Sequence, residues 1–168
     1  MNKAIILKSR PQGTPKLSDF ELVDEKKPEV MQGEVLLKTL FVSVDPYLRG
    51  RMSDADSYVP PFELNKPISS GIVAEVIESK NDNFKKGDFV SDRLDWKEFQ
   101  VSTGESLQKI DPSIQPLSAY LGIIGMTGMT AYTGLTQIGK PKTGETIVVS
   151  GAAGAVGSVV GQIGKILG

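Results

Sequence analysis

The sequence predicts an α+β region built mainly of strands, followed by the beginning of an α/β region. Short β-branched runs separated by turn residues fill roughly the first hundred residues. Pro112–Gly139 then contains no charged residue, and a β-branched run that leads directly into glycines begins at Ile147. We therefore expect one domain over residues 1–118 and the start of a second over residues 119–168.

The first region is expected to form a small antiparallel barrel. Turn residues such as Gln32-Gly33 and Lys86-Gly87-Asp88 separate its apolar runs, as they do where short antiparallel strands follow one another. The predicted strands are Ala4–Lys8, Val35–Val44, Gly71–Ile77, Asp88–Val90 and Glu98–Val101.

Between these strands, Ser53–Pro67 contains several prolines and no apolar periodicity, so a long loop is expected. Long loops inside compact domains often act as lids or binding loops, whereas others only cover a core. The sequence leaves both roles open.

The uncharged stretch is expected to form two short helices around a break at Gly125–Gly128. Thr127 is the expected N-cap of the second helix, because a threonine hydroxyl can accept a hydrogen bond from a free amide at a helix start. Tyr132 follows Met129 within that helix and is expected in the core.

The last part of the chain carries the most informative pattern. Ile147–Val149 is expected to be a buried parallel strand, since such strands are apolar on both faces. A glycine-rich turn and a helix follow, which is the order found in the first half of a dinucleotide-binding unit. Against the pattern G-x-G-x-x-G, the chain reads Ala152-Ala153-Gly154-Ala155-Val156-Gly157, with alanine in place of the first glycine.

Each residue type in this turn has an expected task. The helix N-terminus would bind a diphosphate through its free amides, and Ser158 would add a hydroxyl donor. Gly154 would let the backbone approach the diphosphate, and Gly157 would let the helix lie close to the strand. Gly157, Gly161, Gly164 and Gly168 share one helix face, although each interior glycine costs about 1 kcal/mol relative to alanine. Close backbone packing explains that cost, and a tightly packed helix without a ligand is the alternative interpretation.

Composition excludes several kinds of chemistry. Lys and Arg number 19 against 20 for Asp and Glu, so the net charge of −1 gives no electrostatic reason to bind nucleic acid. The chain has no cysteine, which excludes disulfides and thiolate metal sites. It has no histidine, which excludes a Ser-His-Asp triad and an imidazole base. We expect no metal site, and proton transfer must use other side chains, a cofactor hydroxyl or water.

Hydropathy and the N-terminus favour a cytoplasmic protein. The opening MNKAIILKSRP lacks the long apolar core and cleavage site of a secretory signal. Two uncharged stretches reach membrane-spanning length, and Gly157-x-x-x-Gly161 is a helix-dimer motif in lipid. The interrupting glycines, the many polar residues and a mean hydropathy of −0.10 argue against a membrane span.

Three stretches together resemble one known family. They are Val44–Arg49 (VDPYLR), Gly125–Leu135 (GMTGMTAYTGL) and Ser150–Gln162 (SGAAGAVGSVVGQ). With them the chain resembles the medium-chain dehydrogenase/reductase superfamily, in its zinc-free branch of leukotriene/prostaglandin reductases and alkenal double-bond reductases. The resemblance implies a GroES-like β-barrel catalytic domain, then the truncated start of a Rossmann domain, and NADP(H) as cofactor. The missing histidine and cysteine agree with a zinc-free branch.

The resemblance also implies site residues. Tyr47 is the candidate catalytic side chain, because its hydroxyl can donate to a substrate carbonyl oxygen, and a packed loop aromatic is the alternative. Arg49 and Arg51 either attract a carboxylated substrate or are solvated surface charges. Ser70 stands where plant relatives carry a substrate-facing tyrosine, which argues against phenylpropenal specificity. The residues matched to the cofactor are Asp45, Pro46, Met126, Thr130, Gly154, Ala155, Val156, Gly157 and Ser158.

The activity implied by the resemblance is NADPH-dependent reduction of the C=C bond of α,β-unsaturated ketones and aldehydes. Hydride would pass to the β-carbon, while a tyrosine hydroxyl and a cofactor ribose hydroxyl would stabilise the enolate oxygen. The alternatives are a zinc-free quinone reductase and a non-catalytic fragment that self-associates through an open sheet edge. Relatives are commonly homodimers about twice this length, so we expect residues 1–168 alone to be inactive.

Overall fold

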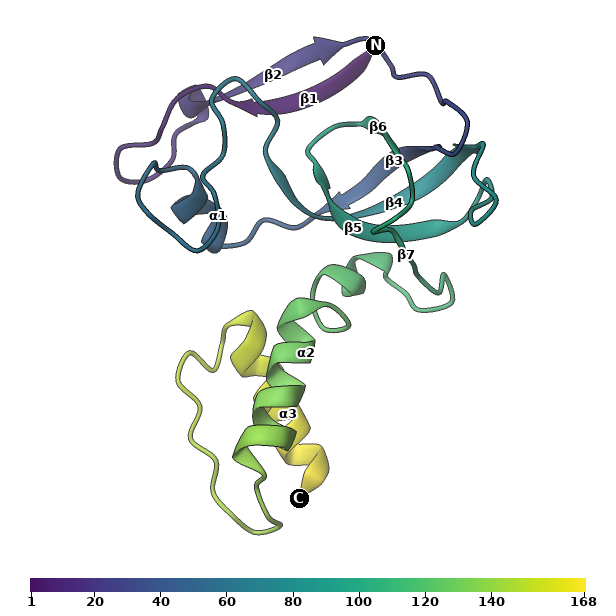
Figure 1. The fold of residues 1–168 in the computed structure, drawn as a ribbon. Helices are drawn as coiled ribbons and strands as arrows, with labels where there is room; N and C mark the ends of the chain where they lie inside the picture. Colours follow the sequence, from purple (N-terminus) through teal and green to yellow (C-terminus); the bar gives the residue numbers. More distant parts are fainter. The chain divides into compact units, whose positions relative to one another are not determined.

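The computed structural model describes residues 1–168, which divide into two compact units, Met1–Pro112 and Ser113–Gly168. Strands dominate the first unit and helices the second (Figure 1). The first unit contains β1 (Asn2–Leu7), η1 (Leu17–Asp19), β2 (Phe20–Glu25), β3 (Val35–Val42), α1 (Tyr47–Arg51), β4 (Ser69–Ser79), β5 (Phe89–Asp95), β6 (Phe99–Ser102) and β7 (Gln108–Lys109). The second contains η2 (Leu117–Leu121), α2 (Met126–Thr133), the π-helical η3 (Gly134–Gly139) and α3 (Ala155–Leu167).

All strand pairs of the first unit are antiparallel. One sheet has the order β6-β3-β4-β5-β7, and a second sheet consists of β1 and β2. Isolated bridges join β1 to Lys97 and Pro67, so the two sheets are linked through backbone hydrogen bonds. Every strand predicted for the first unit forms, and the sheet-rich GroES-like first unit is confirmed.

Two apolar clusters make up the core of the first unit. One lies on the large sheet around Leu37 and Ile72, and the other joins Leu7 and Ile68 to side chains of α1. Trp96 packs against both clusters. Phe62 is buried in the second cluster, so the predicted loop over Ser53–Pro67 forms and covers part of the core.

Four elements of the first unit were not predicted: η1, β2, α1 and the two-residue β7. β2 reads Phe20–Glu25 (FELVDE), and its acidic residues and mostly exposed surface hide the strand pattern. The short α1 begins directly after Pro46, whose φ of −56° is already helical. The prediction treated this segment as a loop.

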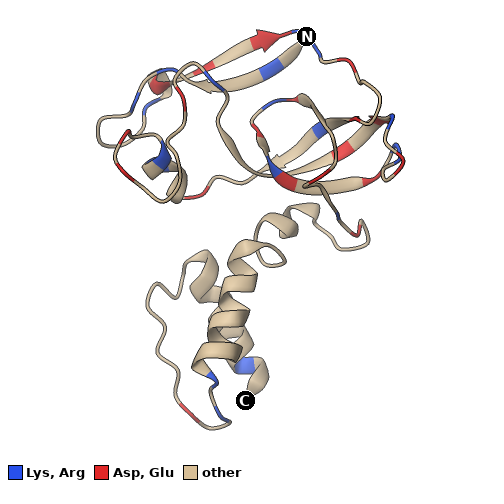
Figure 2. Cartoon of the chain, viewed as in Figure 1, with Lys and Arg blue, Asp and Glu red and all other residues tan.

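The second unit corrects several expectations. Thr127 is not the N-cap, because α2 begins after Gly125 and the Thr127 hydroxyl donates to the carbonyl of Gly122 at 2.9 Å. Tyr132 is 51% exposed and therefore does not belong to a core. Charged residues occur only at 140–145 and at Lys165 (Figure 2).

The prediction of a strand at Ile147–Val149 is wrong for this structure. The segment has no strand pairing, and Val148 is 92% exposed. A parallel strand exists only through hydrogen bonds to neighbouring strands, and residues 113–168 contain no other strand.

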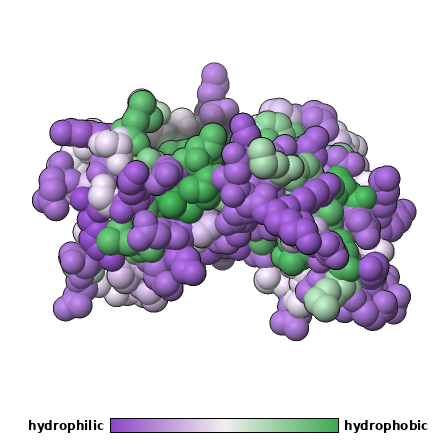
Figure 3. Space-filling model, turned by 90° about the horizontal axis from the view of Figure 1, so that it is seen from above, coloured by the Kyte–Doolittle hydropathy of each residue, from purple (hydrophilic) through white to green (hydrophobic).

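None of the helices combines the length and the apolar character that a membrane span requires. The face of the molecule shown in Figure 3 is mostly hydrophilic, with separate apolar patches.

Candidate functional site

Tyr47 opens α1 and is half-buried, with its ring packed against the second core cluster. Arg93 reaches it from β5: Nη2 of Arg93 donates to the Tyr47 hydroxyl oxygen at 3.4 Å. The guanidinium carbon of Arg93 also lies 5.7 Å from the centre of the Tyr47 ring. The phenol therefore accepts a hydrogen bond from a cation, and its own hydrogen remains available to a ligand.

Arg51 follows Tyr47 by one helical turn. Its Nε donates to the carbonyl of Pro60 at 3.1 Å, and its guanidinium carbon lies 4.0 Å from the centre of the Phe62 ring. The amide of Phe62 returns a hydrogen bond to the Arg51 carbonyl at 2.7 Å. These contacts attach the loop that follows α1 to the helix itself.

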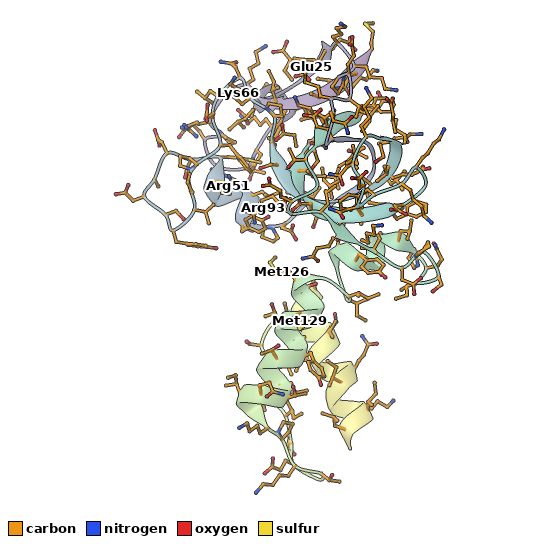
Figure 4. All side chains as sticks on the ribbon, turned by 45° about the vertical axis from the view of Figure 1, so that its right-hand side comes forward. Glu25, Arg51, Lys66, Arg93, Met126 and Met129 are labelled. Atoms are coloured by element: carbon orange, nitrogen blue, oxygen red, sulfur yellow. The ribbon has the colours of Figure 1, made fainter.

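The charge of Arg51 is poorly compensated. Its Nη1 atom is buried and has no hydrogen-bond partner. Burial lowers the pKa of Arg51 below the ordinary value, the charge of Arg93 lowers it further, and Tyr47 opposes these effects. Neither arginine forms an ion pair, and Figure 4 shows the two near each other. We refer to Tyr47, Arg51 and Arg93 as the Tyr47 cluster.

The neighbouring sequence-predicted residues have local structural roles. Arg49 donates three hydrogen bonds to the carbonyls of Pro11 and Gly13, at 2.8–3.0 Å, so it fixes the N-terminal loop and is not a free surface charge. The carboxylate of Asp45 accepts from the Ser43 hydroxyl at 2.7 Å. Pro46 is the exposed N-cap residue of α1.

Ser70 is fully buried and already satisfied. Its hydroxyl donates to the carbonyl of Ser43 at 2.7 Å and accepts from the Trp96 indole at 2.8 Å. In this chain the position therefore supports the packing of Trp96.

In the second unit, the sequence-predicted turn ends in a bare helix N-terminus. Gly154 is the N-cap of α3, its backbone is extended, and no side chain caps the helix. The first amides of a helix have no intrahelical acceptor, so those of Ala155 and Val156 are free to bind an anion. Ser158 is exposed in the first turn. These residues fit the diphosphate of a dinucleotide, although the expected strand before them does not form.

The glycines of α3 differ in their surroundings. A Cβ on Gly157 would overlap the Gly151 carbonyl and lie 2.8 Å from the Cα of Ala152, so the close contact here is with the turn and not with the predicted strand, which does not form. A Cβ on Gly164 would lie 3.0 Å from Cδ1 of Ile147. Gly161 has nothing within 4 Å, so the prediction of close packing along the whole face is wrong at that position.

Met126 and Thr130 lie one turn apart on α2. Met126 is exposed, and the Thr130 hydroxyl donates to the carbonyl of Met126 at 2.7 Å. The structure thus places these two residues together on one helix face. Sequence reasoning missed Arg93, which is 46 positions from Tyr47; no local motif relates the two.

Comparisons with known proteins show what this chain is similar to. Residues 3–110 match the family described as the N-terminal domain of oxidoreductase. The chain is 60% identical over 164 residues to the provisionally named NADP-dependent oxidoreductase YfmJ of Bacillus subtilis, covering 98% of this chain and 48% of that protein. It is 45% identical over 172 residues to the 2-alkenal reductase (NADP⁺-dependent) of Nicotiana tabacum, covering 99% of this chain and 50% of that protein.

A similar fold is found in a solved structure, that of CurA from Vibrio vulnificus in complex with NADPH. The TM-score is 0.90 at 44% identity, and the match covers 99% of this chain and 49% of CurA. The chain thus spans about half the length of the curated relatives it matches.

Proposed function

Because the chain belongs to the zinc-free branch of the medium-chain dehydrogenase/reductase superfamily, whose members here are NADP-dependent oxidoreductases, we propose that the whole protein reduces the C=C bond of α,β-unsaturated ketones and aldehydes. The alkenal reductase named above supports this choice of substrate class. NADPH supplies the hydride when it is bound.

One observation carries the proposal: the Tyr47 hydroxyl accepts a hydrogen bond from Arg93 and keeps its hydrogen free. Negative charge develops on the substrate carbonyl oxygen as hydride reaches the β-carbon. A phenol that donates to that oxygen, with a guanidinium beside it, stabilises this charge without a metal. Tyr47 is therefore the proposed catalytic residue.

The remaining predicted residues are proposed to hold the cofactor. Gly154–Ser158 would bind the diphosphate, and Met126 and Thr130 would lie near the nicotinamide. Asp45 and Pro46 would border the cofactor from the loop before α1. In this proposal residues 1–118 act as the catalytic domain and residues 119–168 begin the cofactor domain.

The test is NADPH oxidation by the whole protein with enals, enones and quinones, for the wild type and for Tyr47→Phe. Removing one donor to a developing oxyanion should lower kcat by about 100-fold or more, while NADPH binding remains. Tyr58→Phe is the matched control, because Tyr58 is almost fully exposed. Turnover of quinones alone, or no turnover with NADPH bound, would contradict the proposal.

A further inference from the structure

The Tyr47 cluster joins two positive charges without a counter-ion. Arg51 and Tyr47 come from α1, and Arg93 comes from β5. The side chain of Arg93 is exposed, and its hydrogen bond goes to the neutral phenol. Arg49 in the same helix differs, because its guanidinium donates three hydrogen bonds to two backbone carbonyls.

The acidic residues closest in sequence do not compensate these charges. Asp54 and Asp56 follow α1 but are exposed and form no ion pair with either arginine. Asp92 precedes Arg93, and its carboxylate bonds to the Arg93 amide and to the Ser106 hydroxyl. A buried guanidinium nitrogen without a partner, such as Nη1 of Arg51, is rare in proteins. The exposed guanidinium of Arg93 is the part of the cluster that a ligand can reach.

Guanidinium groups bind carboxylates especially well, because their N–H donors match the two carboxylate oxygens. We propose that the Tyr47 cluster binds a carboxylate, and that the preferred substrates are α,β-unsaturated carbonyl compounds with a carboxylate a few bonds from the carbonyl. This deepens the proposed function and rests on it. Arg93 Nη2 lies 3.4 Å from the hydroxyl that would hold the carbonyl oxygen, so a carboxylate bound by Arg93 would lie close to that carbonyl.

Binding can be tested without turnover, because all members of the cluster lie within the first unit. Sodium acetate is titrated into the ¹⁵N-labelled chain at constant ionic strength, with acetamide as the neutral comparison, while the Nε–H signals of Arg51 and Arg93 are followed by NMR. Saturable shifts with acetate and none with acetamide are expected. The Arg51 shift should disappear in Arg93→Gln and persist in Lys86→Gln, which removes the same charge from the turn at the other end of β5.

Unchanged arginine signals, or equal shifts with acetamide, would overturn the carboxylate site. A shift that Lys86→Gln abolishes as effectively as Arg93→Gln would also overturn it, because net charge rather than the cluster would then be responsible.

The substrate class is tested with the whole protein on 4-oxo-2-pentenoate and its methyl ester. The kcat/KM ratio of acid to ester should fall by about tenfold in Arg93→Gln and stay unchanged in Lys86→Gln. A ratio that Arg93→Gln leaves unaltered overturns the proposed specificity. If neither compound nor any other enone is reduced while acetate still binds, the proposed reaction fails and the carboxylate site stands.

Discussion

The two units bury their apolar side chains to very different extents. In the first unit Leu7, Leu37, Ile68 and Ile72 have essentially no exposed surface. In the second unit the buried apolar side chains are Leu117, Ala131, Leu135 and Val159, while most of its large apolar residues are exposed. The first unit pairs all its strands internally, whereas the second contains a strand-like segment with no strand to pair with. Apolar composition alone therefore does not make a core; the pairing partners must be present as well.

The sharpest test of this comparison is to replace one apolar side chain by alanine in each unit. Leu37→Ala should lower the free energy of unfolding of the first unit by about 3 kcal/mol, because it leaves a cavity on the large sheet. The side chain of Met129 is 62% exposed, so Met129→Ala should change the free energy of unfolding of the second unit by less than about 0.5 kcal/mol. Urea unfolding followed by the fluorescence of Trp96, the single tryptophan, and by helical circular dichroism separates the units. Equal losses would show that the second unit has a comparable core.

The second unit does have tightly packed backbone contacts, and the tightest is at Gly128. A Cβ on Gly128 would overlap the carbonyl of Ile123. Gly128→Ala should therefore shift the start of α2 and lower the free energy of unfolding by about 1–3 kcal/mol. Gly134→Ala, which meets nothing within 4 Å, should stabilise the helix by about 0.5–1 kcal/mol. Thermal melting by circular dichroism measures both. Opposite signs for the two variants are expected, and a Gly128→Ala variant that is not destabilised would rule out the close contact.

The glycines of α3 sharpen the comparison at the proposed cofactor site. Gly157→Ala should move the helix start away from residues 151–152 and weaken NADPH binding by the whole protein about tenfold. Gly161→Ala should leave binding unchanged, because its surroundings are open. Titration of NADPH fluorescence gives both affinities. If Gly161→Ala weakened binding as much, the whole face rather than the turn would matter.

The smallest effect concerns an ion pair in the first unit. The hydrogen bond from Lys109 to Asp88, at 2.8 Å, and then one from the Lys85 amide hold the pKa of Asp88 below its ordinary value of 3.8. Because the folded state favours the ionised form, this contribution is present above the unfolded-state pKa and is lost as the pH falls through the folded-state pKa. Asp88→Asn should therefore lower the free energy of unfolding by up to about 1 kcal/mol near neutral pH and by much less in acid.

The measurement is urea unfolding of the wild type and Asp88→Asn as a function of pH, followed by Trp96 fluorescence. Asp82→Asn, an exposed carboxylate in the neighbouring turn, is the control. A stability difference that grows as the pH falls would have the wrong sign for this ion pair.

Local pattern was sufficient where neighbours in the sequence decide the structure. The strands that were predicted in the first unit have short β-branched runs and turn residues between them, and Gly157 follows the spacing of a known turn. Contacts between residues far apart in the sequence could not be predicted from local pattern. Arg93 meets Tyr47 only because β5 and α1 approach in space, and the unpaired nitrogen of Arg51 depends on the burial produced by the loop with Phe62.

Ile147–Val149 also bears on how the chain is expected to behave when it is concentrated. The segment is β-branched and uncharged, and it belongs to no helix or sheet, so its backbone can bond to an identical segment of another molecule. We expect this segment to favour association between copies at high concentration, even while the sheets of the first unit remain folded.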